Sequence, residues 1–136
     1  MPANTSPIFT LTPVIEFNNS ISGANTATDG TGTPVYLVFT AGTNGSYVQK
    51  IRFRHTSSNA TATVARIFIN NGGATTTAAN NVLFDEITIA VNTIVQTAAS
   101  TNYELPLNFA LPPNYIIFVT IGTAANLDAT IIGGDY

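Results

Sequence analysis

The segment from Val35 to Asn70 constrains the fold more than any other part of the chain. It holds three stretches rich in β-branched and aromatic residues, VYLVFT, YVQKIRFRH and TATVARIFIN, separated by two short polar turns. This pattern predicts three strands in a row. Asn44-Gly45 in the first turn predicts a hairpin, because both residues tolerate positive φ. The nearly unbroken apolar run Val35–Thr40 predicts burial on both faces or a central place in a sheet.

Residues 47–55 alternate between two faces, as a strand with one buried side does. The face assigned to the core carries Tyr47, Gln49, Ile51 and Phe53. The face assigned to the outside carries Val48, Lys50, Arg52 and Arg54.

Every basic residue of the chain lies in this segment, as does the single histidine. Arg66 is on the next predicted strand, and in a hairpin without a bulge it would lie beside Lys50, Arg52 and Arg54. That placement depends on the register of the strands, which the sequence leaves open. His55 ends its strand beside Arg54, and we interpret it as a solvated turn residue.

The whole chain predicts an all-β fold, an antiparallel β-sandwich of about eight strands. No stretch has a convincing helical period, and several long cross-over loops favour a jelly roll over an up-and-down barrel. The loop Ser22–Thr33 is too polar to pack, and Asn70–Asn81 is a second long, flexible loop. The expected strands are 14–21, 35–40, 47–55, 61–70, 82–91, 103–111, 115–121 and 127–132.

Two interruptions of the strand pattern have structural meaning. Asp85 breaks the apolar face of strand 82–91, which predicts a bulge or a rim position there. Pro106 points outward from the cleanly alternating strand 103–111. Because proline cannot donate to a neighbouring strand, 103–111 is predicted to be an edge strand.

The chain divides into an arm, residues 1–13, and a single β-sandwich domain, residues 14–136. Three prolines break the arm, and its apolar residues Ile8, Phe9 and Leu11 are more than a solvated tail needs. We interpret the arm as a tether to a neighbouring subunit, with a frayed terminus as the alternative.

Charge is scarce throughout the chain. Charged residues make up 8% of the 136 residues, the net charge is −3, and Thr, Asn and Ser take the place of charged side chains. So little charge gives little repulsion between copies. This composition favours a subunit with a place in an assembly over a monomer in a crowded solution.

The inventory of reactive side chains is thin, and we expect no enzyme activity and no cofactor. The chain has no cysteine and one histidine, which excludes zinc sites of the Cys/His kind. Its glycine-rich loops lack the lysine and helix of a phosphate loop. The acidic balance argues against nucleic acid as a partner. The longest apolar run, Tyr115–Ile121, is too short to span a membrane, and no signal peptide is visible.

The order of segments resembles small β-sandwich structural proteins of tailed bacteriophages. The resemblance covers most of the chain from Val35 onward and rests on VYLVFTAGTNGSYVQKIRFRHTSSNATATVARIFINNG, YELPLNFALPPNYIIFVTIGT and a terminal GGDY. Several such proteins look like capsid decoration, or cement, proteins. The resemblance implies a homo-oligomer, with a trimer favoured, bound to the major capsid protein on the head surface of a virion and made in the host cytoplasm.

From this we expect the arm and the cations to form the contact with the capsid or another partner, through Ile8, Phe9, Leu11, Lys50, Arg52, Arg54 and Arg66. One alternative is a tail-fibre, head-fibre or receptor-binding module that recognises host surface glycans, with the loops Ser22–Thr33 and Asn70–Asn81 clustered at one end. A small hydrolase or lyase on a jelly-roll scaffold is a third class, and it would need His55 beside a carboxylate in a pocket.

Overall fold

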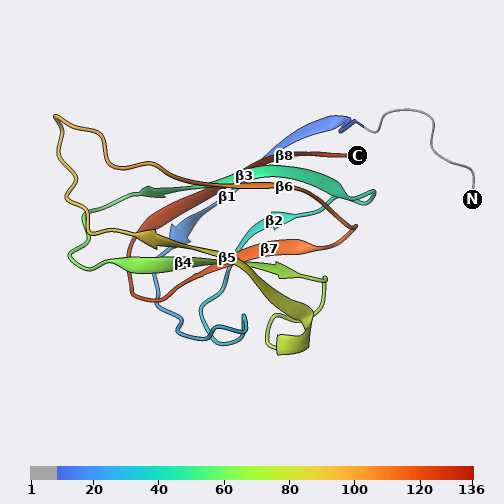
Figure 1. Cartoon of the computed structure of the whole chain (residues 1–136), viewed down its shortest axis with the longest axis horizontal. Coiled ribbons are helices and arrows are strands. Elements are labelled where there is room, and N and C mark those ends of the chain that lie inside the picture. Colours follow the sequence, from blue (N-terminus) through green and yellow to red (C-terminus); the bar gives the residue numbers. More distant parts are fainter. Residues whose placement is uncertain (1–8) are drawn as a thin grey trace, which may run out of the picture.

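The computed structural model describes residues 9–136, which form two antiparallel four-stranded sheets packed face to face (Figure 1). Sheet A has the order β1-β8-β3-β6, and sheet B has the order β2-β7-β4-β5. The strands are β1 Thr12–Ile21, β2 Tyr36–Thr40, β3 Ser46–His55, β4 Thr63–Asn70, β5 Asn81–Ile89, β6 Tyr103–Leu111, β7 Ile116–Ile121 and β8 Leu127–Asp135. Within the described residues the helical content is one short 3-10 helix, η1 Ala78–Asn80.

The strands pair as if one long hairpin had been wound around the core. β1 pairs with β8, β2 with β7, β3 with β6 and β4 with β5, all antiparallel. The pairings β3 with β8 and β4 with β7 then join these ribbons into the two sheets. This winding is that of a jelly roll, so the predicted antiparallel sandwich of eight strands is confirmed.

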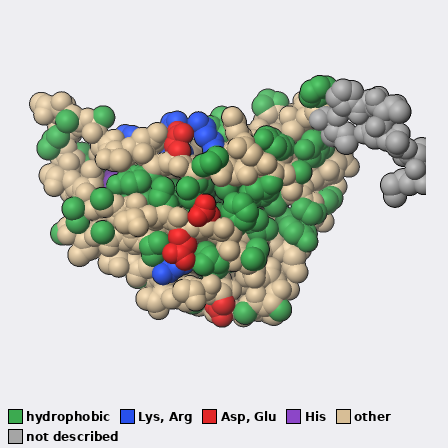
Figure 2. Space-filling view, viewed as in Figure 1, with side chains coloured by type: hydrophobic (Ala, Val, Ile, Leu, Met, Phe, Trp, Pro, Cys, Tyr) green, Lys and Arg blue, Asp and Glu red, His purple; other side chains and the backbone are tan. Residues whose placement is uncertain are grey.

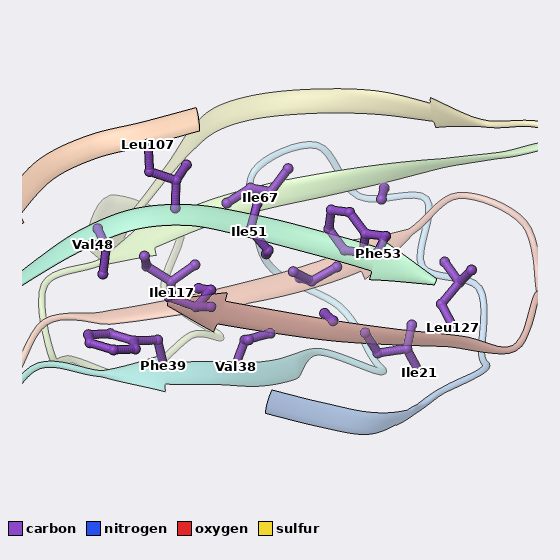
Figure 3. Close-up of a cluster of buried hydrophobic side chains, with 14 of the residues drawn as sticks. Ile21, Val38, Phe39, Val48, Ile51, Phe53, Ile67, Leu107, Ile117 and Leu127 are labelled. Carbon is purple, nitrogen blue, oxygen red and sulfur yellow. The ribbon is translucent and has the colours of Figure 1, made fainter. Parts of the chain in front are cut away.

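The core fills the space between the sheets (Figure 3). Ile51 and Phe53 of β3 are fully buried there, as predicted, and they face sheet B. Apolar side chains at alternate positions of each strand supply the rest, because successive residues of a strand point to opposite faces. The largest fully buried members of this cluster are Phe39, Phe53, Ile21, Ile51, Ile67, Ile89, Ile117, Ile121, Leu127 and Ile131.

A β-bulge corrects the predicted faces of the first half of β3. Val48 pairs with Gly133 of β8, and Lys50 pairs with the adjacent Ile132, so Gln49 is an extra residue on β3. An extra residue reverses the alternation. Val48, predicted on the outside, is therefore fully buried, and Gln49, predicted in the core, is exposed.

The predicted hairpin at Asn44-Gly45 is wrong, although a turn is present there. Gly45 has φ 85° and its N–H donates to the carbonyl of Gly42 over 3.0 Å. However, β2 belongs to sheet B and β3 to sheet A, so this turn carries the chain between sheets. The segment Val35–Thr40 forms an edge strand, and Leu37 on it is 49% exposed, so neither the predicted central place nor the predicted burial on both faces is found.

The two predicted interruptions are found. β6 is an edge strand of sheet A, and Pro106 is exposed on it. On β5 the register shifts at Phe84, because Leu83 pairs with Phe68 and Asp85 pairs with the adjacent Ile67.

The loop between β1 and β2 packs on sheet B, against the prediction that it is too polar to pack. It crosses the outer face of the sheet, below it in Figure 1, and the N–H of Asn25 donates to the carbonyl of Ile121 over 2.7 Å. Phe68 and Phe118 point away from the main core on this face, yet they are buried and stack with ring centroids 5.0 Å apart. The middle of the outer face of sheet B is thus buried, while Leu37 at its β2 edge stays exposed.

The second long loop, between β4 and β5, is also held in place by asparagine side chains. Nδ2 of Asn70 donates to Oδ1 of Asn81 over 2.8 Å. Nδ2 of Asn81 donates to the carbonyl of Thr75 over 2.8 Å. These bonds close the loop around η1, so the prediction of a flexible loop does not describe its geometry.

We predict that Asn25→Ala destabilises the fold. The buried Nδ2 of Asn25 donates to the carbonyls of Thr31 and Pro34 over 3.1 and 3.0 Å, so the substitution leaves both acceptors unpaired. The expected loss is about 1 to 3 kcal/mol in the free energy of unfolding, measured by chemical denaturation. The matched control is Asn19→Ala at an exposed position, where the change should stay within about 0.5 kcal/mol. Equal effects of the two substitutions would contradict this prediction.

Candidate functional site

The outer face of sheet A carries exposed and half-buried side chains. It lacks the loop that crosses sheet B, and its register sets the residues in rows. One row across the face runs Phe17, Thr130, Arg52 and Glu104. The next row runs Ile15, Ile132, Lys50 and Pro106. The face therefore passes from an apolar edge on β1 to cations on β3.

We call Lys50, Arg52 and Arg54 the cation stripe. The three side chains leave β3 on the side opposite Ile51 and Phe53, as predicted. Lys and Arg side chains gather along the upper edge of Figure 2, where sheet A lies. Nη1 of Arg54 donates to the carbonyl of Ser100 over 3.2 Å, which ties the stripe to the loop before β6.

Glu104 on β6 is the carboxylate partner of two cations in the stripe. Nζ of Lys50 lies 3.3 Å from Oε2 of Glu104, and Nε of Arg52 donates to Oε1 over 2.7 Å. Hydrogen bonds from Arg52 first, and then from Asn102, lower the pKa of Glu104 from 4.5 to about 2. Because two cations face one carboxylate, this part of the surface retains a net positive charge.

Sequence reasoning missed the role of Glu104. The alternation of strand 103–111 placed Glu104 on the outward side, and that assignment is correct. However, Glu104 lies 52 residues from Arg52 in the chain, and only the pairing of β3 with β6 sets them opposite each other. The sequence contains no signal for that pairing.

Arg66 does not join the cation stripe, so the predicted cluster of four cations is wrong. It lies on β4 in sheet B, with Nε 3.8 Å from Oε1 of Glu86. Its Nη1 donates to the carbonyl of Asn25 over 3.4 Å. The prediction failed because the chain crosses from sheet A to sheet B after β3 and does not form a hairpin between β3 and β4.

The apolar residues of the predicted arm continue onto the edge of sheet A. β1 begins at Thr12, inside the predicted arm, and the N–H of Leu11 donates to the carbonyl of Asp135 over 2.8 Å. Phe9 and Leu11 are both exposed. Ile8, the third predicted contact residue, lies outside the described residues. The observed part of the arm thus extends the apolar edge that Ile15 and Phe17 form on β1.

His55 is buried, and the prediction of a solvated turn residue is wrong. Its ring meets the ring of Tyr103 edge-on at 6.1 Å, and neither ring nitrogen has a hydrogen-bond partner among the described residues. Burial, reinforced by the positive charge of Arg54, lowers the pKa of His55 below 6.5. The geometry is that of a neutral packing residue.

The two long loops meet at the end of sheet B. Nδ2 of Asn81 donates to the carbonyl of Asp29 over 3.3 Å, which links the loop before β5 to the loop after β1. Beside this contact is a hollow of about 220 Å³, whose lining includes Asn71, Asn80 and Tyr115. Amide and hydroxyl groups around such a hollow can form hydrogen bonds with a polar neutral ligand.

Within residues 9–136, no group of three or more His, Asp or Glu side chains is placed so that it could hold a metal ion. No helix in this part of the chain is long and apolar enough to cross a membrane.

No protein-family model and no curated protein matches the chain. Among solved structures, a chain in the structure of infectious bursal disease virus, Gt strain, is similar with a TM-score of 0.31 and 13% sequence identity. The match covers 97% of this chain and 36% of the viral chain, so this protein spans about a third of the length of that chain. A similarity of this size carries no argument about fold or function, and the fold assignment rests on the strand order.

We predict that Glu104 contributes to acid sensitivity. Its pKa is lower in the folded state than its ordinary value of 4.5, so its contribution to stability is present above that pH and is lost as the pH falls toward 2. In Glu104→Gln the free energy of unfolding should therefore fall less steeply over this range. Denaturation followed at several pH values measures the slope, with Glu86→Gln on sheet B as the matched control. Parallel profiles for wild type and Glu104→Gln would refute the prediction.

His55 should make the stability of the fold depend on pH in a second, separate range. Its folded-state pKa is lowered, so the unfolded chain takes up a proton more readily and stability is lost as the pH falls below 6.5. His55→Phe keeps an aromatic ring in the apolar site and removes the titrating group. The variant should therefore lose the decline in melting temperature between about pH 7 and pH 5. A variant that retains the full decline would show that other groups cause it.

Proposed function

We propose that this protein is a non-enzymatic structural protein of a phage virion, a capsid decoration protein that binds the outer surface of the head. The observation that carries the proposal is the outer face of sheet A, where the cation stripe lies beside an apolar edge and no loop covers either. Isolated exposed apolar residues are ordinary on a protein surface, whereas a contiguous apolar area marks a contact surface.

In this proposal the partner is the major capsid protein, and several copies of the chain, with a trimer favoured, sit together on the head. Phe9 and Leu11, with the preceding arm that includes Ile8, supply apolar contact. Lys50, Arg52 and Arg54 orient the chain toward carboxylates on the capsid; Arg66, on the opposite sheet, is left out of this surface. Charged groups of this kind set orientation and register more than affinity. Repetition of the site over the head makes weak single contacts sufficient.

Binding to heads prepared without this protein tests the proposal. Phe9→Ser combined with Leu11→Ser should weaken binding by roughly tenfold or more, because each apolar side chain contributes about 1.5 kcal/mol when buried. Co-sedimentation at increasing protein concentration measures how many sites on the heads are occupied, and the change in the half-saturating concentration gives the loss of affinity. The control pair, Val91→Ser with Val95→Ser, removes exposed apolar residues away from the proposed surface. Saturation of heads by the Phe9/Leu11 variant at wild-type concentrations would overturn the proposed contact.

A second candidate is a fibre or receptor-binding module that recognises host surface glycans. The observation in its favour is the meeting of the two long loops beside the hollow at Asn71, Asn80 and Tyr115. Sugar hydroxyls would pair with the two amides, and the tyrosine ring offers an apolar surface. Binding to a glycan array that is lost in Asn80→Ala would support this candidate over the capsid role.

A further inference from the structure

The side of the sandwich between the edge strands β5 and β6 carries a strip of exposed apolar side chains. β5 ends sheet B and β6 ends sheet A, and the rings of Phe84 and Phe109 meet across the opening with centroids 4.9 Å apart. Val82 is 56% exposed and Phe84 is 44% exposed. Ile87 of β5 is half-buried. We call Val82, Phe84, Ile87 and Phe109 the β5/β6 strip.

The strand register places these side chains on one surface. Val82, Asp85 and Ile87 of β5 each pair with a residue of β4 that packs in or against the core. Because directly paired residues point to the same face of a sheet, the three side chains lie on the side of sheet B that faces sheet A. They stand at the edge of that side, where no further strand covers them.

Asp85 puts a carboxylate without a cationic partner into this strip. It is exposed, and its Oδ1 accepts the N–H of the adjacent Glu86 over 2.7 Å. Within the part of the chain that the structure describes, no Lys or Arg forms an ion pair with it. Figure 2 shows hydrophobic side chains crossing this side of the molecule, with acidic groups among them. The strip therefore fits a ligand that carries apolar groups and a positive charge together.

The hollow of about 220 Å³ at the end of sheet B continues the strip, because Val82 belongs to both. Ile69 and Tyr115 add apolar lining, and Asn71 and Asn80 add amide groups. At about 30 Å³ per water molecule, the hollow has room for one apolar side chain. The amides can form hydrogen bonds with the backbone groups of a bound chain.

We infer that the strip and the hollow bind an extended peptide segment of another protein. One apolar side chain of the segment enters the hollow beside Val82, and a Lys or Arg pairs with Asp85. The bulge at Phe84 shortens the interval between Val82 and Asp85 to two strand steps, or about 7 Å. In an extended peptide, residues two positions apart cover this distance and face the same side. The expected ligand thus has its cation two residues from a large apolar residue.

A second copy of this chain does not supply the cation that Asp85 lacks. Each of the chain's four basic residues already contacts an acidic side chain or a backbone carbonyl of its own copy: Lys50, Arg52, Arg54 and Arg66. A two-fold contact of strip with strip would also bring two Asp85 carboxylates toward each other. The charge pattern therefore favours a foreign segment over a second copy.

A peptide also fits this surface better than a glycan does. A neutral sugar could form hydrogen bonds with the amides of the hollow, but it has no group that pairs with Asp85 or covers Phe84. The inference goes beyond the proposed function, because the strip is separate from the outer face of sheet A. It needs no capsid for its test, so failure of peptide binding and failure of head binding are separate results.

Selection from a random library of displayed peptides tests the inference on the full-length protein. We expect the enriched peptides to share a Lys or Arg two residues from a large apolar residue. The same selection on Asp85→Lys should enrich Asp or Glu at that place, because the substitution reverses the charge and leaves the apolar groups. Enriched peptides without the basic residue, or with the same charge pattern on both proteins, would overturn the inference.

The affinity of one enriched peptide, labelled and followed by fluorescence anisotropy, tests the individual contacts. Phe84→Ser should weaken binding by roughly tenfold, because an apolar contact is lost. Asp85→Asn should weaken it up to about fivefold, since exposed ion pairs contribute little. The matched controls are Phe17→Ser, at an exposed position on β1, and Glu86→Gln, whose side chain leaves the other face of β5. Both controls should bind as the wild type does.

The outcomes separate the possible occupants of the strip. Wild-type affinity in both Phe84→Ser and Asp85→Asn would contradict the inference, and if Phe84→Ser does not fold, Asp85→Asn and Asp85→Lys decide alone. A dimer of the wild type that Phe84→Ser abolishes in analytical ultracentrifugation would assign the strip to a second copy. Glycan binding that Asn80→Ala abolishes, without any enriched peptide, would assign the hollow to a sugar. Either result would overturn the inference.

Discussion

The packing of β3 against sheet B is the contact on which the rest of the structure depends. Val48, Ile51 and Phe53 place β3 at the centre of the core, and β3 is hydrogen-bonded to β8 on one side and β6 on the other. Because the side chains of a strand alternate, burial of these residues forces Lys50 and Arg52 onto the outer face. The core and the candidate site are therefore two faces of one strand, and a slip in register would exchange them.

The two sheets differ in what covers them, and this difference makes one face available. On sheet B the loop after β1 is anchored through Asn25, so Phe68 and Phe118 are buried although they point away from the main core. On sheet A the corresponding surface carries Ile15 and Phe17, which have no such cover. A Thr-rich loop with a single charged residue, Asp29, can pack in this way because the amide of Asn25 satisfies two backbone carbonyls. Low charge thus serves the internal packing.

Local patterns in the sequence predicted local features well and pairings poorly. The buried positions Ile51 and Phe53, the edge strand with Pro106 and the irregularity beside Asp85 follow from alternation and from the chemistry of proline. The bulge at Gln49 and the partnership of Arg52 with Glu104 do not. They depend on which strands lie side by side. In a jelly roll the paired strands come from the two arms of the wound hairpin and can be far apart in the sequence. The prediction for Arg66 fails for the same reason, because it requires β3 and β4 to be neighbours and the chain changes sheet after β3.

The four edge strands limit the kind of assembly that this sandwich can form. Side chains of β1 occupy backbone groups of β2, Pro106 removes a donor from β6, and a bulge at Phe84 distorts β5. Such features block the addition of further strands and so protect against open-ended aggregation. The apolar side chains beside those edges remain exposed all the same. Contacts at the edges must then be made by side chains, which require a specific fit, and such contacts favour an assembly of defined size over a fibril.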